Sequence, residues 1–341
     1  MSSRLSLNVA FFVRHFTPNG TEVAIYDYAH YNEEILGNKS YIVHLSPQKQ
    51  VEFGFPVMRT SYAKFSDRFE IFQLDDIIEM KNLIEEKNLD FFYTLTHGAF
   101  GDIYQFENKG IWGKCKTIKH CVYYLNGHES DYYISIYNNS RIPTIPHMVS
   151  LPDCNETLSD LLQIPKTATV FGCHGAPQAF DLQIAHEAIN EYIDTDPNVY
   201  FLFMGIDSSF HAPHPRIIHL KQNVDLLFKT KFINTCNVMI HGRQAGESFG
   251  CSVAEFSSRN KPVITCPSPA MNEHLRILGD RAIIYKTKDE LKNIFRNINN
   301  ILLKRDNNND NNDWNAYTSY TPIKVMNLFN EYIFHQTDLS K

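Results

Sequence analysis

Residues 238–265 read VMIHGRQAGESFGCSVAEFSSRNKPVIT. The apolar run at 238–241 predicts a buried strand, and a glycine-containing loop follows it. A helix is expected over 249–258, and the apolar run at 262–266 predicts the next strand. A buried strand, a helix and a second buried strand in this order are typical of a parallel sheet covered by helices.

Two glutamates in this stretch are separated by seven residues, with Glu247 before the expected helix and Glu255 within it. A carboxylate accepts two hydrogen bonds at once, so each could bind a vicinal diol of a sugar or a ribose. The first-turn amides near Phe249 and Gly250, together with the helix dipole, are suited to hold a phosphate. The alternative is an amphipathic helix whose acidic side chains are only solvated.

The same alternation of apolar runs and helical segments occurs in both halves of the chain. In the first half it predicts strands at 5–13, 41–45, 90–96 and 117–125 and helices at 21–36 and 75–88. In the second half it predicts strands at 169–173, 199–204, 238–241, 262–266 and 282–285 and helices at 180–193, 224–235, 249–258 and 288–303. The pattern indicates an α/β protein with two Rossmann-like domains.

A proline-rich stretch at 141–165 resists both helix and central strand, and we take it as the connection between the domains. The first domain is therefore expected over 1–150 and the second over 151–305. Residues 306–313 are Asn and Asp only, an insertion with nothing to bury. The remaining segment, 314–341, contains a helical apolar face that should dock on the rest of the protein.

Composition excludes several classes of function. The chain has 341 residues and a net charge of -6, which leaves no basic surplus for a general nucleic-acid binder. No stretch approaches the roughly 20 apolar residues of a membrane span. The seven cysteines include no C-x-x-C pair, which argues against zinc and thioredoxin-like sites and favours reduced thiols in a cytoplasmic protein.

The segment from Glu247 to Glu255 resembles the Glu-x7-Glu signature of retaining GT-B glycosyltransferases, most closely those of family 4. The resemblance implies two Rossmann-like domains that face a cleft, with residues 314–341 returning to pack on the first domain. It implies that Glu247 is catalytic and contacts the donor sugar, and that Glu255 holds the ribose of the nucleotide. Backbone amides near Phe249 and Gly250 would face the donor diphosphate.

The resemblance extends to the first turn of each domain. The family often has a Gly-Gly loop after the first strand, and this chain keeps only Gly20, which we expect near the donor phosphates. The alternative is an ordinary strand-to-helix turn with Thr21 as the N-cap. In the second domain the resemblance places Gly172 and His174 in the donor site.

The chain departs from the family pattern after Gly172. Family members usually have an Arg just after this glycine and a Lys several residues later, and both contact the diphosphate. Here Cys173 and His174 occupy the first position, and Gln178 lies near the second. The charge of the leaving group must be stabilised by other groups, for which the candidates are Arg243, which we include in the donor site, Lys221, Lys229 and Lys231.

His97 directly follows the strand expected at 90–96, at the edge where doubly wound sheets bind ligands. In similar enzymes a histidine in the interdomain cleft faces the donor sugar or the acceptor, so we assign His97 to the catalytic site. The alternative is an ordinary surface or core histidine.

The sequence therefore predicts a retaining, hexosyltransferase-type enzyme that uses a nucleoside-diphosphate sugar and a hydroxyl-bearing acceptor, a glycan or another small molecule. We expect no bound cofactor, and the resemblance implies a metal-independent donor site. We also expect no nucleic-acid partner and no transmembrane segment, while peripheral contact with a membrane stays open. The alternatives are a GT-B binding protein that has lost catalysis and a sugar-nucleotide epimerase of the same fold.

Overall fold

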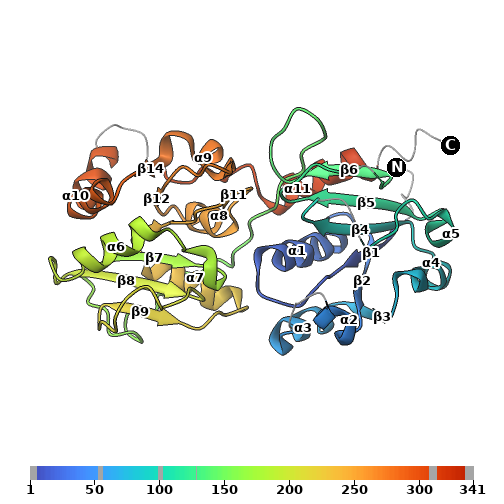
Figure 1. The fold of residues 1–341 in the computed structure, drawn as a ribbon, viewed down its shortest axis with the longest axis horizontal. Coiled ribbons are helices and arrows are strands. Elements are labelled where there is room, and N and C mark those ends of the chain that lie inside the picture. The colour runs from blue at the N-terminus through green and yellow to red at the C-terminus, as the bar shows by residue number, and fades with distance from the viewer. Residues whose placement is uncertain (1–5, 53–56, 99–102, 128, 307–312, 335–341) are drawn as a thin grey trace. The chain divides into compact units, whose positions relative to one another are not determined.

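The computed structural model describes residues 6–52, 57–98, 103–127, 129–306 and 313–334 (Figure 1). The chain divides into two compact units. Unit 1 comprises Met1–Met148 and Tyr320–Lys341, and unit 2 comprises Val149–Ser319.

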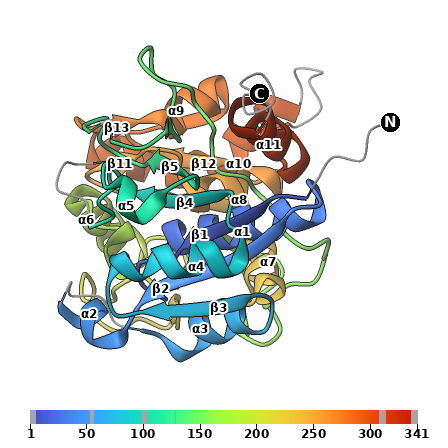
Figure 2. The ribbon, with the colours of Figure 1, turned by 90° about the vertical axis from the view of Figure 1, so that its right-hand side faces the viewer.

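Unit 1 is built on a parallel sheet, whose described strands lie in the order β3-β2-β1-β4-β5-β6 (Figure 1; β1 to β5 are also labelled in Figure 2). The strands are β1 (Asn8–Phe12), β2 (Lys39–Leu45), β3 (Glu70–Leu74), β4 (Phe91–Thr96), β5 (Lys116–Cys121) and β6 (Tyr132–Ser135). The helices are α1 (Gly20–Glu34), α2 (Pro47–Glu52), α3 (Arg59–Ser66), α4 (Met80–Lys87), α5 (Lys109–Trp112) and α11 (Pro322–Phe329).

Alternate residues of β1 supply the two cores of unit 1, because successive side chains of a strand lie on opposite faces. Phe12 belongs to a buried cluster with Met80 of α4 and Trp112 of α5. On the other face the ring of Phe11 lies 5.2 Å from that of Tyr93. Both faces of the sheet are therefore covered, as in doubly wound proteins.

The C-terminal helix packs on this second face, as predicted. The rings of Tyr28 and Tyr93 lie 5.4 Å and 5.9 Å from the ring of Phe329 in α11. A π-helical turn, Asn330–Phe334, continues α11, and the Phe334 ring lies 4.8 Å from that of Phe91. The last part of the chain thus completes the hydrophobic core of the N-terminal sheet.

Unit 2 repeats the design with a parallel sheet of described strands in the order β14-β12-β10-β7-β8-β9. A separate small ladder pairs β11 with β13. The strands are β7 (Thr169–His174), β8 (Val199–Met204), β9 (Ile217–Leu220), β10 (Val238–Ile240), β11 (Gly246–Glu247), β12 (Val263–Thr265), β13 (Met271–Asn272) and β14 (Ala282–Ile284). The helices are α6 (Gln183–Tyr192), α7 (Leu226–Thr235), α8 (Cys251–Ser258), α9 (Glu273–Leu278) and α10 (Lys288–Asp306).

Within each unit, numbering the main-sheet strands in chain order gives the sequence 3-2-1-4-5-6, the order of dinucleotide-binding Rossmann domains. The prediction of two Rossmann-like α/β domains is therefore confirmed. The chain order alone could not show this, because the same series of strands could pair in other ways.

The segment that enters α11 belongs partly to unit 2, which differs from the expectation that all of 314–341 would pack on the first domain. The backbone oxygen of Trp314 accepts a hydrogen bond from Ser257 Oγ at 2.8 Å. Tyr317 donates from its hydroxyl to the backbone oxygen of Phe249 at 2.9 Å. Buried aromatic side chains on both residues therefore keep this segment on α8.

The edge strands β3, β6 and β9 were missed, although the central strands were predicted. Each of these strands lies at a sheet edge and carries partly exposed residues. The apolar pattern also predicts no helix between 41–45 and 75–88, where the structure contains α2 and α3. An edge strand is buried less than a central one, so its apolar pattern is weaker.

Candidate functional site

The candidate site lies on the two central strands of unit 2, β7 and β10. The strand order reverses between them, since β8 and β9 continue from one and β12 and β14 from the other. Doubly wound sheets bind ligands outside the carboxyl ends of the strands at this reversal. His174 is the last residue of β7, and His241 directly follows β10, so both imidazoles lie at this edge.

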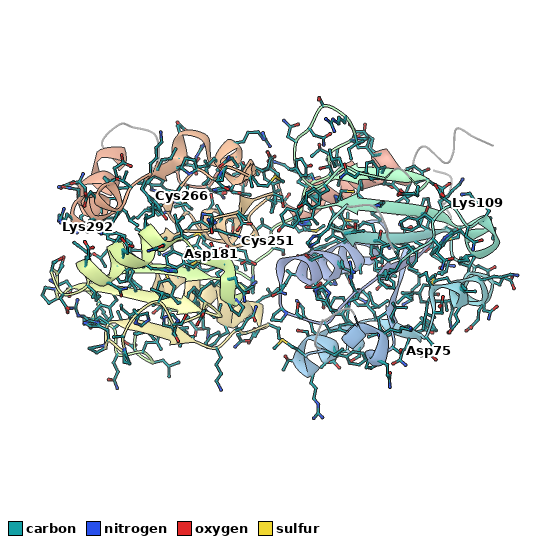
Figure 3. All side chains as sticks on the ribbon, viewed as in Figure 1. Asp75, Lys109, Asp181, Cys251, Cys266 and Lys292 are labelled. Atoms are coloured by element: carbon teal, nitrogen blue, oxygen red, sulfur yellow. The ribbon has the colours of Figure 1, made fainter. Side chains whose placement is uncertain are left out.

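The loops that leave these two strands are hydrogen-bonded to each other. The backbone nitrogens of Asp181 and Leu182 both donate to the oxygen of Gly242 at 3.0 Å. The backbone nitrogen of Gln244 donates in turn to the carboxylate of Asp181 at 2.7 Å, and Asp181 is labelled in Figure 3. Asp181 was not singled out from the sequence because its partner lies 63 positions away.

Glu247 forms the short strand β11 together with Gly246. Gly246 has φ +67°, and a Cβ at this position would lie 1.8 Å from the backbone oxygen of Met271, so the residue must be glycine. One carboxylate oxygen of Glu247 lies 3.4 Å from His241 Nε2, and the other accepts from Arg243 Nη1 at 2.9 Å. Burial alone would raise the pKa of Glu247, but His241 and Arg243 outweigh it and hold the pKa below its ordinary value.

Glu255 lies in α8 and is buried between two basic groups. Lys229 Nζ donates to one carboxylate oxygen at 2.8 Å, and His174 Nε2 lies 2.9 Å from the other, in poor alignment for a hydrogen bond. Burial again favours the neutral acid, but Lys229 and then His174 lower the pKa of Glu255 to about 2. The glutamate expected at the ribose is therefore a carboxylate held at the end of β7.

The loop before α8 has the conformation of a helix entry. Gly250 is the N-cap and has φ +80°, which glycine adopts without strain. Cys251, labelled in Figure 3, is the first residue of the helix, two positions later than predicted. The Phe249 side chain is buried against Tyr317, with ring centroids 5.4 Å apart, so only its backbone is suited to contact a ligand.

The glycine expected at the diphosphate, Gly172, lies inside β7. A Cβ there would be 2.2 Å from Cys236 Sγ, so close packing of the strand on α7 accounts for this glycine. The Cys173 side chain is also buried within the strand, whereas Gln178 is exposed in the turn that follows. Of the residues at the expected arginine position, only His174 lies at the ligand-binding edge.

The candidate cations have partners that the sequence did not reveal. Arg243 and Lys229 each contact one of the two site glutamates. Lys231 pairs with Glu156 at 2.6 Å, and Lys221 is exposed after β9. Lys229 was considered for the diphosphate, but the structure places its ammonium on Glu255.

The two predicted site residues of unit 1 lie at the corresponding edge of its sheet. Gly20 is the exposed first residue of α1, and the N-cap is Asn19 rather than Thr21. His97 follows β4 and is exposed, with its ring 5.2 Å from that of Tyr123. Partial desolvation of the ring by neighbouring protein atoms, followed by the nearby charges of Arg14 and His15, lowers the pKa of His97.

Among the described residues, no cluster of three or more His, Cys, Asp or Glu side chains is placed to hold a metal ion. In the same part of the chain, no helix combines the length and the apolar character needed to cross a membrane. All seven cysteines are free thiols.

Similar folds occur in enzymes that handle nucleotide sugars. The structure of Anabaena HepE in complex with UDP-glucose matches with a TM-score of 0.69 and 12% identity, over 97% of this chain and 100% of that one. A glycosyltransferase from Rickettsia africae matches with a TM-score of 0.66 and 13% identity, over 98% and 97% of the two chains. The structural neighbours thus include glycosyltransferases that share the GT-B layout along the whole chain.

An enzyme described as a putative UDP-N-acetylglucosamine 2-epimerase, from Listeria monocytogenes, also matches. Its TM-score is 0.59 with 12% identity, over 99% of this chain and 98% of that one. No protein-family model and no curated protein sequence matches the chain. At these identities the comparisons show that the chain has the two-domain α/β fold of GT-B proteins.

Proposed function

We propose that the protein transfers a sugar from a nucleoside diphosphate to a hydroxyl group of an acceptor, and that unit 2 binds the donor. The observation that carries this proposal is the pair Glu247 and Glu255, both ionised at the carboxyl edge of β7 and β10. The two carboxylates can accept hydrogen bonds from a sugar and from a ribose, and the backbone amides at the entry of α8 can hold a diphosphate between them. The likeness to HepE, whose structure holds UDP-glucose, supports the same assignment.

In this proposal each residue has a defined role. Glu247 accepts hydrogen bonds from hydroxyls of the donor sugar, and Glu255 accepts them from the ribose. The bond between the sugar carbon and the diphosphate oxygen breaks, the acceptor oxygen takes its place, and the acceptor proton passes to the leaving diphosphate. The backbone at Phe249 and Gly250, together with the Arg243 guanidinium, stabilises the charge of the leaving group. His97 and Gly20 belong to the acceptor and phosphate contacts that unit 1 would supply.

We further propose that transfer proceeds with retention and without a metal or bound cofactor, as the resemblance to family 4 implies. The donor is a hexose nucleotide, and the acceptor is a glycan or another hydroxyl-bearing small molecule. Free thiols throughout the chain are consistent with a reducing, cytoplasmic setting.

The first test is calorimetric titration with UDP, GDP and ADP, followed by an assay for nucleotide released from the corresponding sugars. Glu247→Gln should bind the nucleotide normally and lose turnover, because it keeps the size of the side chain and removes its charge. Glu191→Gln is the matched control, since Glu191 is also ion-paired in unit 2 but lies on the surface of α6. Wild-type turnover in Glu247→Gln would refute the assignment. The anomeric configuration of the product, read by NMR, tests retention.

A second candidate is a sugar-nucleotide epimerase. It is favoured by the two imidazole–carboxylate pairs at the site, His174–Glu255 and His241–Glu247, and by the likeness to the Listeria protein. The same assay separates the two reactions. An epimerase would convert the sugar while the nucleotide stays attached, so no free nucleotide would accumulate.

A binding protein without catalysis is the remaining alternative. Its support is that Arg243 and Lys229 contact the site glutamates, while the usual Arg and Lys positions after β7 hold other residues. Tight nucleotide-sugar binding with no turnover on any acceptor, and no hydrolysis, would favour this reading.

A further inference from the structure

A chain of polar side chains extends from Glu247 away from the candidate site. His241 Nε2 lies 3.4 Å from the Glu247 carboxylate, and His241 Nδ1 lies 2.8 Å from Thr265 Oγ1. The same hydroxyl oxygen lies 3.1 Å from Nε2 of His274. Glu247 lies in β11, Thr265 is the last residue of β12, and His274 lies in α9. Three separate elements therefore contribute side chains to this polar network.

The side chains that continue this network beyond Glu247 are shielded from water. Thr265 and His274 have no exposed surface, and His241 is 1% exposed. Without water, these polar atoms depend on the protein groups around them, and Nδ1 of His274 is buried without a hydrogen-bond partner in the described structure. The positions of the protons are therefore set by the partners within the chain.

A single hydroxyl proton determines how the two rings are protonated. Thr265 has one hydroxyl proton, and the contacts described for this hydroxyl are His241 Nδ1 and His274 Nε2, so the proton is paired when Thr265 donates to one ring and accepts from the other. One and only one of these two ring nitrogens can then carry a proton. Because the Glu247 carboxylate only accepts, His241 Nε2 must carry a proton in either arrangement.

The two arrangements differ in the charge of His241. With one proton, His241 keeps it on Nε2, Thr265 donates to Nδ1, and His274 donates to Thr265 from Nε2. With two protons, His241 donates to Thr265, which donates to His274, so the His274 proton moves to Nδ1. No hydrogen bond is formed at Nδ1 of His274 in the described structure, but the backbones of Glu247 and Cys266 lie near the ring and favour a proton on it.

The surroundings keep His274 neutral in both arrangements. Burial, followed by the neighbouring His241, lowers the pKa of His274 to about 3. The other charged or titratable groups around the chain are Arg243 on Glu247, Tyr285, which donates to the backbone oxygen of His241 at 2.9 Å, and the buried thiols of Cys266 and Cys173.

We propose that Thr265 and His274 are positioning residues that orient Glu247 through His241, and that the charge of His241 is coupled to the tautomer of His274. The positioning role rests on the proposed function of Glu247. The proton coupling depends only on the contacts described above.

The coupling is tested by NMR of the full chain labelled with ¹⁵N-histidine, with the His274 signals identified by their loss in His274→Gln. At every pH, one of the two nitrogens facing Thr265 should be protonated and the other bare. Where His241 gains charge, His274 should change tautomer while staying neutral. Two protonated or two bare nitrogens would overturn the coupling, as would a fixed His274 tautomer while His241 titrates.

Matched controls sharpen this experiment. Thr265→Val keeps the shape of the side chain and should make the His274 tautomer independent of His241, whereas Thr265→Ser should preserve the coupling. His120 is the control histidine, because it is buried with a pKa of about 3 and its Nε2 is bound to the Ile145 carbonyl, so its tautomer should not change. Retained coupling in Thr265→Val would also overturn the proposal.

The positioning role is tested by kinetics. In Thr265→Val the kcat for donor turnover should fall about tenfold with the nucleotide Kd unchanged, because a buried hydrogen bond that orients the carboxylate is lost. Thr265→Ser should stay close to wild type. Wild-type kcat in Thr265→Val would overturn the positioning role. Absence of turnover in the wild-type protein would instead overturn the proposed function and the positioning role with it, and the NMR result would still decide the proton coupling.

Discussion

Removal of one partner of the ion pair between Lys229 and Glu255 should strongly destabilise unit 2. Both side chains are about nine-tenths buried, and the ammonium lies 2.8 Å from the carboxylate. The pKa of Glu255 falls from an ordinary 4.5 to about 2. At about 1.4 kcal/mol for each factor of ten in the proton equilibrium, the lowered pKa corresponds to about 3 kcal/mol. Removal of either partner leaves an uncompensated buried charge, for which a cost of about 3–5 kcal/mol is typical.

We therefore expect Glu255→Gln and Lys229→Met each to lower the free energy of unfolding of unit 2 by about 3 kcal/mol. The double variant should lose much less than the sum, because neither charge then remains buried alone. Chain unfolding by urea can be followed separately in each unit, since Trp112 lies in unit 1 and Trp314 in unit 2. Labelling with 5-fluorotryptophan gives one ¹⁹F signal for each.

Lys231→Met is the control on the same helix, because Lys231 pairs with an exposed glutamate and should leave the Trp314 transition unchanged. The pH dependence supplies a second check. A carboxylate whose pKa is lower in the folded state than in the unfolded state stabilises the folded state fully at pH values above the unfolded pKa. The contribution of Glu255 to the free energy of unfolding should therefore fade as the pH falls from about 4.5 to about 2, and Glu255→Gln should lack this pH dependence. Additive effects of the two single variants would refute the reasoning, because they would show that the two charges do not interact.

Three further predictions concern the backbone, a buried hydroxyl and acid sensitivity. Gly246→Ala should lower the urea midpoint of the unfolding transition reported by Trp314 and abolish nucleotide release, since its Cβ would meet the Met271 carbonyl. Normal turnover in this variant would contradict the prediction. Tyr317→Phe removes the hydroxyl bonded to Phe249 and should cost unit 2 about 1 kcal/mol in urea, with the Trp112 transition unchanged. Burial lowers the pKa of His120 to about 3 and of His147 to about 4, so unit 1 binds fewer protons folded than unfolded. The urea midpoint of the transition reported by Trp112 should therefore fall as the pH is lowered from about 6.5 toward 4. A midpoint that does not change with pH would count against neutral buried imidazoles at His120 and His147.

The central strands were predictable because they are buried on both faces. β8 reads VYFLFM and was placed at 199–204, as observed, and β7 and β10 were placed within one residue at each end. The edge strands β3 and β9 were missed, since partial exposure allows residues such as Gln73 and His219 within them. Sequence periodicity reports burial, so it is weakest where burial is incomplete.

The glutamates of the candidate site were found from the sequence, but their surroundings were not. The Glu-x7-Glu spacing and the expected helix at 249–258 singled out Glu247 and Glu255. The sequence offers Lys229 only as one of several candidate diphosphate ligands, and it gives no sign of a role for Thr265 or His274. These partners are brought together by the sheet order, which pairs β10 with both β7 and β12.

The sequence by itself determined the two-domain α/β character of this protein and the segment that carries its chemistry. Local periodicity and short-range spacing are sufficient for both, because they depend on neighbouring residues. Only the tertiary structure decided which groups hold the carboxylates of Glu247 and Glu255 and keep them ionised. Burial would favour the neutral acids. At Glu255 that preference is reversed by Lys229, which lies 26 positions away in the sequence, whereas at Glu247 it is reversed by His241 and Arg243 of the preceding loop. Electrostatic interactions of this kind act through space, so they follow from the way the strands pair rather than from the order of the residues.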